Sequence, residues 1–470
     1  MEKLYKIEKP DLSNYHTHLD DFYLDALYQN EGGNVLLDNF LDTLTEARKK
    51  TENPEYLNWK DIKYKSWVPE FKEPKKDNAK TFWSYIKAYR KDKACHTVIR
   101  DENGKYFTWT KLSRHEKMAH EIDMDMTKYL LDFPKILETN HQEFQRKSLI
   151  EEAIASSQLE GAHTTRKAAK QMIEEKREPR NADERMILNN FITMEAIQKK
   201  YKNKKLTIKS LLELHKMLTI GAKNLDESEQ GNFRSSSDKI VIAKGDDPTV
   251  ISYITPSIDF VKTEIQRLID FANDELGEDF IHPVTKAIML HFWIGLLHPF
   301  VDGNGRLARG LFYWYLLRQG GNYWAFALLS ISIAIKAAPA QYSEAYIFSE
   351  QDDNDLTYFV DYNFRKIAQA AENFKKYVSN KLREAREAEE IMSKHHNLTQ
   401  RQIKILSLLR ENPHKLLNVS LCVKIYEVTK ATAIKDLKQL LHLGFVKTER
   451  RGKNVYYRPT NKIAAVFNGD

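Results

Sequence analysis

The sequence has almost no cysteine and no long apolar segment, and both absences narrow the class of protein. Only Cys95 and Cys422 occur in 470 residues, far apart and without a histidine cluster. They predict free thiols in a reducing compartment and exclude a disulfide framework. No run of 18 apolar residues occurs, which argues against a membrane span. Residues 1–10 lack the apolar core of a signal peptide. We therefore expect a cytoplasmic protein with no membrane partner.

Internal repeats and low-complexity tracts are also missing. A length of 470 residues predicts two or three domains, and a hydrophobic content of 42% is ample for packed cores. The net charge of +7 is unevenly distributed, because residues 395–470 hold 14 Lys+Arg against 5 Asp+Glu. The rest of the chain holds 59 Lys+Arg against 61 Asp+Glu. A basic C-terminal region is the electrostatic footprint expected of a nucleic-acid-binding module.

The most informative segment runs from His298 to Gly310 and reads HPFVDGNGRLARG. A second helical pattern begins within this segment, at Leu307. We therefore expect a tight, glycine-containing connection that leads into the N-terminus of a new helix. His298 is predicted to end the preceding buried helix, because apolar residues recur there at helical spacing, namely Val284, Ile288, Met289, Phe292, Trp293, Leu296 and Leu297.

This connection combines residue types suited to a polyphosphate. Glycines let backbone N–H groups approach a ligand, and a helix N-terminus adds positive potential. Arg306 and Arg309 are three residues apart, so both would project near the same face and fork onto phosphate oxygens. Asp302 is a hard ligand suited to Mg²⁺. His298 can accept a proton from a hydroxyl at neutral pH. Together these residues predict nucleophilic attack on a nucleotide phosphate.

The segment matches the motif HxFx(D/E)GNGRxxR at every specified position, and it therefore resembles the Fic family. The resemblance implies transfer of AMP from ATP to a Ser, Thr or Tyr hydroxyl of a target protein. It makes His298 the general base and Asp302 the ligand of a Mg²⁺ ion at the α- and β-phosphates. The implied phosphate-binding residues are Gly303, Asn304, Gly305, Arg306 and, at the γ-phosphate, Arg309, with Phe300 as the buried anchor.

Further likeness to the Fic family extends over roughly residues 140–370. Residues 231–234 followed by 239–243 resemble the family's flap hairpin, and their alternating and β-branched residues support a short strand. In the family this edge docks the backbone of the target by strand addition. Tyr342 resembles a family position near the nucleotide base. The docking residues implied here are Ile240, Val241 and Ile242.

Residues 154–161, IASSQLEG, resemble the inhibitory motif (S/T)xxxE(G/N) of the same family. Ser156 and Glu160 are four residues apart and share one helical face. By resemblance, the Glu160 carboxylate would pair with Arg309 and keep ATP from binding productively. In some relatives the same glutamate helps to remove AMP from the target, and the sequence leaves this role open.

The C-terminal residues predict a second module. Thr399 begins one helix, Val419–Tyr426 form another, and residues 428–444 form a turn and a third helix. Two short strands around a basic turn follow at residues 445–458. The arrangement resembles a winged helix-turn-helix domain, with the third helix in the major groove and the wing on phosphates. The predicted DNA contacts are Lys430, Thr432, Lys435, Arg450, Arg451 and Lys453.

The expected fold is mainly α: a Fic helical core with a small β-hairpin flap, plus the winged helix-turn-helix domain. A winged-helix protein is also expected to form a homodimer. Four parts of the chain are expected. Residues 1–139 form a mostly helical N-terminal region without an assigned role, and residues 140–371 form the Fic domain with its inhibitory helix. Residues 372–394 form a helical linker, and residues 395–470 form the winged helix.

Two classes of function fit the sequence. The first is an adenylyltransferase restrained by Glu160, with a DNA-binding tail and a target that includes the protein itself. The second is a transcriptional regulator whose Fic domain only senses a nucleotide, although such a sensor would not need His298. A different nucleotide donor also stays open, because the loop contacts phosphates and not the base. The winged helix could serve protein contacts instead, but its basic wing favours DNA.

Overall fold

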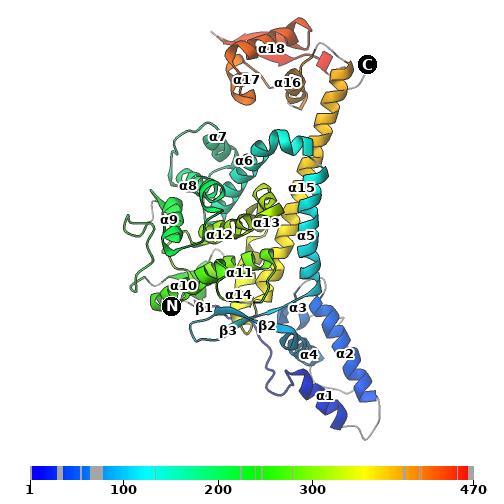
Figure 1. Cartoon of the computed structure of the whole chain (residues 1–470), viewed down its shortest axis with the longest axis vertical. Helices are drawn as coiled ribbons and strands as arrows, with labels where there is room; N and C mark the ends of the chain where they lie inside the picture. The colour runs from blue at the N-terminus through cyan, green and yellow to red at the C-terminus, as the bar shows by residue number, and fades with distance from the viewer. Residues whose placement is uncertain are drawn as a thin grey trace. The chain divides into compact units, whose positions relative to one another are not determined.

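The computed structural model describes residues 3–28, 35–52, 56–63, 78–132, 134–222, 225–238, 240–244, 247–277, 279–394, 398–411, 413, 415–451 and 454–463. The chain forms two compact units, Met1–Glu372 and Asn373–Asp470. As expected, the fold is mainly helical with small sheets (Figure 1). No helix within the described ranges is long and apolar enough to cross a membrane.

The first unit contains most of the secondary structure. Its elements are β1 (Lys3–Leu4), α1 (Leu19–Tyr28), α2 (Val35–Glu52), α3 (Trp59–Lys63), α4 (Asn78–Lys93), β2 (Ala94–Arg100), β3 (Tyr106–Thr110), α5 (Ser113–Asp132), α6 (Pro134–Leu159), α7 (Arg166–Glu174), α8 (Ala182–Ala196), the π-helical turn η1 (Ile197–Tyr201), α9 (Ile208–Thr219), β4 (Val241–Lys244), β5 (Asp247–Ile254), α10 (Ile258–Ala272), α11 (Pro283–Leu297), α12 (Asn304–Arg318), the 3₁₀ helix η2 (Gly321–Leu328), α13 (Ile331–Lys336), α14 (Pro339–Gln351) and α15 (Thr357–Lys394).

Helices α11 and α12 form the centre of this unit, with α8, α9, α10, α13 and α14 around them (Figure 1). Nearly every residue of α11 is buried, which explains why its sequence is apolar all round. Trp293 and Trp314 are among the largest fully buried side chains and belong to these two helices. The loop that joins the two helices therefore starts and ends in the most rigid part of the unit.

A hairpin forms from β4 and β5, at residues 241–254, and belongs to a three-stranded sheet in the order β1-β5-β4. The flap was expected at residues 231–234 and 239–243, and in the described part of this range only the residues of β4 form a strand, since residues 231–234 form turns and irregular backbone. Strands β4 and β5 are antiparallel, with Val241 opposite Ile254. Strand β1 joins β5 in parallel, with Leu4 opposite Ile251. The short strand β4 was expected from the alternation of its residues, but β5 and the third strand, which comes from residues 3–4, were not.

The N-terminal part of the first unit is attached to α15 through a buried carboxylate. Asp361 accepts hydrogen bonds from Arg114 Nη2 at 2.7 Å and from His115 Nε2 at 2.9 Å. Burial by itself raises the pKa of Asp361, but the hydrogen bond from His115 and the charge of Arg114 hold it well below its usual range. Burial lowers the pKa of His115, so this ring is neutral and donates its Nε2 proton.

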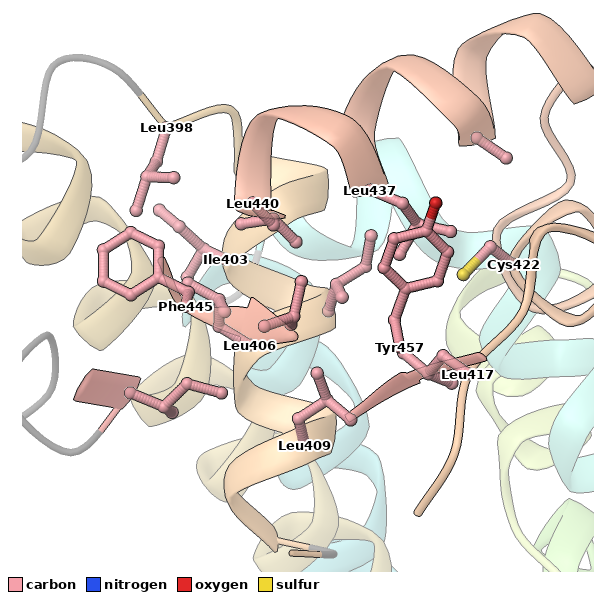
Figure 2. Close-up of a cluster of buried hydrophobic side chains, with 14 residues drawn as sticks. Leu398, Ile403, Leu406, Leu409, Leu417, Cys422, Leu437, Leu440, Phe445 and Tyr457 are labelled. Carbon is pink, nitrogen blue, oxygen red and sulfur yellow. The ribbon is translucent and has the colours of Figure 1, made fainter. Parts of the chain in front are cut away.

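The second unit contains α16 (Gln400–Glu411), α17 (Val419–Tyr426), α18 (Lys430–His442) and the hairpin of β6 (Val446–Arg451) and β7 (Asn454–Pro459). Leu417 forms a bridge with Tyr457 of β7. Ala433, Leu437 and Leu440 of α18 are buried in the core of this unit, with Leu437 and Leu440, both labelled in Figure 2, at 0% exposure. Residues 372–394 are helical as expected, but they continue α15, which begins at Thr357.

We predict that Asp361→Asn lowers the free energy of unfolding at pH 7 by about 3–5 kcal/mol, because it leaves Arg114 without its buried counter-charge. The folded-state pKa of Asp361 is depressed, so its contribution is present at neutral pH and is lost as the pH falls through that pKa. Urea denaturation between pH 7 and pH 3 should therefore show a difference in the free energy of unfolding between wild type and variant, and this difference should become smaller below about pH 4. Asp92→Asn, at an exposed side chain, is the control, and a gap independent of pH would contradict the assignment.

Candidate functional site

His298 follows the last residue of α11 and adopts a left-handed conformation, with φ 45° and ψ 58°. This conformation ends the helix and turns the chain into the loop. His298 Nδ1 lies 3.2 Å from the carbonyl oxygen of Gly295. Burial lowers the pKa of His298, although Glu160 and Asp302 act in the opposite direction. The ring is therefore neutral at pH 7, and a proton on Nδ1 leaves Nε2 as an acceptor.

The loop after His298 is held closed by Asn304. Its side chain accepts a hydrogen bond from the backbone N–H of Phe300 at 3.0 Å and donates one to the carbonyl of Phe300 at 2.8 Å. Phe300 is fully buried and Asn304 is 2% exposed. Both polar groups of the Asn304 side chain are thus used inside the loop, which leaves its backbone for any ligand.

The two glycines of the loop are needed for different reasons. Gly303 has φ 88° and precedes α12, and a Cβ there would lie 3.2 Å from Thr219 Cγ2 and 3.3 Å from His215 Nε2. Gly305 lies inside the first turn of α12, and a Cβ there would collide with the Glu160 carboxylate. The tight connection is therefore shorter than the sequence suggested, and the helix already includes Asn304 and Gly305.

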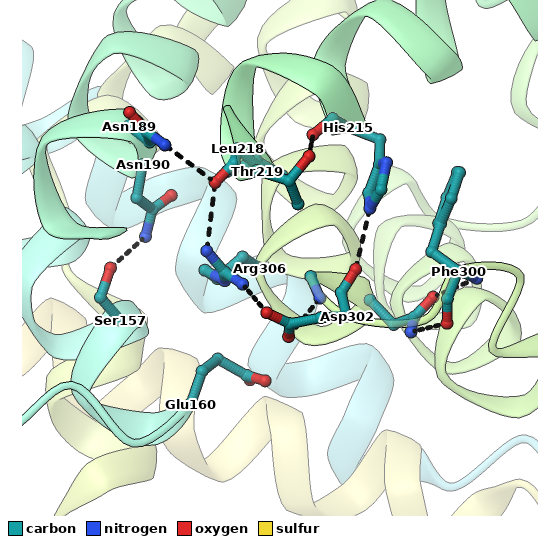
Figure 3. A network of polar contacts seen from close by, with 12 residues as sticks. Ser157, Glu160, Asn189, Asn190, His215, Leu218, Thr219, Phe300, Asp302 and Arg306 are labelled. Carbon is teal, nitrogen blue, oxygen red and sulfur yellow. Dashed lines mark hydrogen bonds and ion pairs between the residues drawn. The ribbon is translucent and has the colours of Figure 1, made fainter. Parts of the chain in front are cut away.

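Asp302 and Arg306 form an ion pair at the start of α12. Asp302 Oδ1 accepts the Gly303 N–H at 2.6 Å, and Oδ2 lies 3.0 Å from Arg306 Nη2. Arg306 Nη1 also donates to the carbonyl of Leu218 at 3.2 Å, as Figure 3 shows. Arg306 is 1% exposed, whereas the Asp302 side chain is 36% exposed. Asp302 is therefore accessible to a ligand, and the buried Arg306 holds the Asp302 carboxylate through their ion pair.

Arg309 is directed to a different set of partners from those of Arg306. Its Nε donates to Ser156 Oγ at 2.8 Å, and its Nη2 donates to the Ser156 carbonyl at 3.0 Å and to Glu160 Oε1 at 2.8 Å. Burial by itself lowers the pKa of Arg309, but the charge of Glu160 raises it above the usual value. In the structure, Arg306 and Arg309 thus contact different protein groups.

One nitrogen of Arg309 stays without a partner. Arg309 is 3% exposed, and its Nη1 has no hydrogen-bond acceptor among the described residues. An unpaired buried donor next to the candidate loop is the arrangement expected where a ligand oxygen completes the set.

Helix α6, which carries Ser156, is fastened into the core of the unit. Glu152 accepts hydrogen bonds from Ser330 Oγ and from the backbone N–H of Ser332, both at 3.0 Å. One turn later, Ser157 Oγ accepts the side-chain N–H of Asn190 at 3.2 Å, a contact also visible in Figure 3. Glu160 follows directly after the last residue of α6. Its backbone therefore continues from a helix that is hydrogen-bonded to other elements of the unit.

Tyr342 lies on α14 close to Arg309. Its hydroxyl group is 2.8 Å from His291 Nε2. Burial raises the pKa of Tyr342, and the charge of Arg309 opposes this. Burial and the charge of Arg309 also lower the pKa of His291 to about 3. Tyr342 is thus a neighbour of the arginine, and its predicted contact with a nucleotide base stays a prediction.

The flap is connected to the backbone around His298. Arg234 Nε donates to the carbonyl of His298 at 2.8 Å, and Tyr253 Oη on β5 donates to the carbonyl of Leu296 at 2.9 Å. On β4, Val241 is 40% exposed and Ile242 is partly exposed, and Ile240, which directly precedes β4, is also partly exposed. Within the described ranges, β4 pairs with β5 and with no other strand. Its outer edge is therefore open beside the loop.

His215 is a site residue that sequence reasoning missed. Its Nε2 lies 2.8 Å from the carbonyl oxygen of Asp302, and its Nδ1 accepts the Gly231 N–H at 3.1 Å. The ring stacks on Phe300 with centroids 3.7 Å apart. Burial lowers the pKa of His215 to about 4. In the sequence, His215 lies beside the apolar residues of α9. An analysis of hydrophobic spacing does not identify such a histidine as a site residue.

The residues predicted to contact DNA lie in the second unit. Lys430 and Lys435 on α18 are exposed, Thr432 is partly exposed, and Arg450 on β6 is exposed. The side chain of Arg451 and the whole of Lys453 lie outside the described residues. The exposed positions agree with an outward-facing side of α18, and DNA contact itself stays a prediction.

Comparisons with known proteins identify the centre of the first unit. Residues 205–316 match the model of the Fic/DOC family. Protein adenylyltransferase Fic of Drosophila willistoni is 34% identical over 115 residues, which are 24% of this chain and 20% of that protein. Protein adenylyltransferase fic-1 of Caenorhabditis elegans is 31% identical over 116 residues, with the same two shares. The match therefore spans about a fifth of the length of these curated relatives.

The crystal structure of a Fic family protein from Desulfovibrio desulfuricans G20 shares the fold. Its TM-score is 0.50 at 20% sequence identity, over 75% of this chain and 97% of that chain. Residues 205–316, which match the Fic/DOC family model, include the flap and the loop. Ser156 and Glu160 precede this range.

We predict that His215→Phe lowers the free energy of unfolding by about 2–4 kcal/mol, because it leaves the carbonyl of Asp302 and the N–H of Gly231 unsatisfied while keeping the stacked ring. Hydrogen exchange of the loop amides should accelerate as well. His163→Phe, at an exposed position, is the matched control.

The same substitution has a pH signature. The folded-state pKa of His215 is about 4, so between roughly pH 6.5 and pH 4 the unfolded chain takes up a proton that the folded chain does not. Protonation of His215 in the unfolded chain therefore lowers the free energy of unfolding of the wild type over this pH range. The variant has no His215, so its free energy of unfolding lacks this decrease. Equal stability of wild type and variant at every pH would show that His215 does not hold the loop.

Proposed function

We propose that the protein transfers AMP from ATP to a Ser, Thr or Tyr hydroxyl of a target protein. The observation that carries the proposal is the joint placement of a neutral His298, an accessible Asp302 and a helix N-terminus within one loop. The match of this region to proteins named protein adenylyltransferase supports the same reaction.

In the proposed reaction, the hydroxyl oxygen of the target attacks the α-phosphorus of ATP. A bond forms between them, the bond from the α-phosphorus to the bridging oxygen breaks, and pyrophosphate leaves. The hydroxyl proton passes to His298 Nε2, which is the free acceptor of the ring when Nδ1 donates to Gly295. Positioning and charge stabilisation supply the rest of the acceleration.

The phosphates are proposed to lie at the N-terminus of α12, on the backbone amides near Gly303 and Gly305. Groups of three or more His, Cys, Asp or Glu side chains that could hold a metal ion do not occur in the described part of the chain. A single exposed carboxylate fits Mg²⁺, which keeps several waters and shares phosphate oxygens. Asp302 would hold this ion, which neutralises phosphate charge when bound.

We further propose that the Glu160–Arg309 pair restrains the enzyme. The Glu160 carboxylate lies against Gly305 and uses one nitrogen of Arg309. A nucleotide phosphate at this helix N-terminus would meet a negative charge and an occupied arginine. The restraint is therefore both electrostatic and steric, and removal of the carboxylate should relieve both.

The second unit is proposed to bind DNA as a winged helix. Three helices and a β-hairpin share one core in this unit, and its exposed Lys430, Lys435 and Arg450 lie on α18 and β6. The excess of Lys and Arg over Asp and Glu in residues 395–470 favours a nucleic acid partner over a neutral protein surface.

Glu160→Gly is expected to raise label transfer from α-labelled ATP to protein by about tenfold or more, a change that needs only ~1.4 kcal/mol. The double variant Glu160→Gly/His298→Ala should lose the labelling. The assay contains Mg²⁺, the protein and a cell extract. Labelling that survives loss of His298 would exclude it as the base, and absence of labelling with ATP bound would favour another donor or a nucleotide-sensing role.

The pH dependence gives a separate expectation for the Glu160→Gly protein. A general base must be unprotonated, and the pKa of His298 is lowered by burial. The acid limb of the labelling rate should therefore lie below the ordinary imidazole value of about 6.5. An acid limb above that value would contradict a neutral, buried base.

Lys435→Ala and Arg450→Ala are each expected to weaken binding of a labelled random-sequence duplex. The slope of log K against log salt should fall in magnitude by about 0.9 for each DNA phosphate that the protein no longer neutralises. Lys167→Ala, an exposed lysine in the first unit, controls for net charge. Binding that does not respond to salt, or that is absent in the wild type, would reject the DNA proposal.

A further inference from the structure

The first residues of the chain form part of the candidate target-docking sheet. Strand β1 pairs in parallel with β5, and the Tyr5 N–H continues this pairing with a hydrogen bond to the carbonyl of Ile251 at 2.7 Å. Strand β5 therefore has β4 on one side and residues 3–5 on the other. On this second side, β5 is already paired at Val250 and Ile251.

Gln351, the last residue of α14, fixes this N-terminal segment. Its Oε1 accepts the Ile7 N–H at 2.8 Å, and its Nε2 donates to the carbonyl of Tyr5 at 3.1 Å and to that of Ser252 on β5 at 3.3 Å. One side chain thus satisfies backbone groups of the N-terminal segment and of β5 from a helix of the core.

A second contact reaches from the N-terminal segment to β4. Lys244 Nζ lies 3.2 Å from the centroid of the Tyr5 ring. Lys244 is the last residue of β4, and Tyr5 follows β1. A cation over an aromatic face is attracted by the negative face of the ring. The contact therefore couples the two outer strands of the sheet across β5.

The same sheet is attached to the loop of the candidate base. Tyr253 lies next to Ser252 on β5 and donates to the carbonyl of Leu296, two residues before His298. A shift of β5 would change the distance between the open β4 edge and His298. The N-terminal segment and Gln351 hold β5 from the side opposite to β4.

We infer that residues 3–5 are a third strand of the flap, and that Gln351 is the positioning residue that holds them together with Ile7. This strand covers β5 at Val250 and Ile251, so an extended target segment adds to the β4 edge, which has no strand beside it within the described ranges. Gln351 touches no reacting group and acts by placing the docking edge relative to His298. The inference rests on the proposed function for the target, but the bracing of the sheet does not.

The test compares Gln351→Ala and Gln351→Glu with the parent, all in the full-length Glu160→Gly protein. The glutamate variant keeps the acceptor for the Ile7 N–H and loses both donors. Gln266→Ala is the matched control, because Gln266 is exposed on α10 and bonds only to Asp270 of its own helix. A second pair, Tyr5→Leu against Tyr5→Phe, removes or keeps the ring under Lys244 if a Gln351 variant folds poorly.

Two readouts separate bracing from catalysis. Hydrogen exchange of the β5 amides near Ile251–Tyr253 should accelerate by about tenfold or more in Gln351→Ala, since this substitution removes three hydrogen bonds. Labelling of extract proteins from α-labelled ATP should fall severalfold, while the affinity for ATP with Mg²⁺ stays within about twofold, because the phosphate-binding loop is intact.

Each outcome decides part of the inference. Unchanged exchange in Gln351→Ala and Tyr5→Leu would overturn the third strand. Faster exchange with unchanged labelling would overturn the positioning role. If the Glu160→Gly parent labels nothing, the proposed function fails, and the exchange data alone still decide whether residues 3–7 brace the flap.

Discussion

The buried charge of Arg309 is the constraint around which the candidate site is organised. A guanidinium in the interior is strongly unfavourable without a counter-charge and hydrogen-bond acceptors. Here Glu160 and Ser156 supply most of them, from a helix end that Glu152 fixes to the core. Arg309 Nη1 has no hydrogen-bond acceptor within the described part of the chain. In the structure as it stands, the protein's own carboxylate compensates Arg309, and a polyphosphate is the chemical group that could replace it.

The loop between α11 and α12 is rigid for a related reason. Its polar backbone groups are satisfied by side chains from outside the loop as well as within it: His215 at Asp302, Arg234 at His298 and Asn304 at Phe300. Burial keeps His215 and His298 neutral, which each role needs. A preorganised loop does not have to rearrange when charge develops on a ligand. Residues outside the motif, such as His215 and Arg234, therefore also hold the backbone of the loop in place.

Sequence spacing was sufficient for features that depend on neighbours along the chain. The apolar pattern before His298 predicted a buried helix, and α11 ends one residue before it. Four-residue spacing placed Ser156 and Glu160 on one face, and Arg309 contacts both. Arg306 and Arg309, which were expected to project near the same face, contact different protein groups, and their joint binding of phosphate stays a prediction. In the structure Arg306 turns to Leu218 and Asp302, because a buried guanidinium goes where acceptors are.

The sequence by itself determined the helical character, the glycine-containing loop after His298 with its residue types, and the basic character of the C-terminal region. These are local properties, set by periodicity, glycine conformation and charge. Only the tertiary structure decided which carbonyl His215 would hold, that residues 3–5 would add a strand to the flap, and that Gln351 would hold them. Such contacts join residues as many as 346 positions apart. They depend on packing of the whole core, which leaves no periodic trace in the sequence.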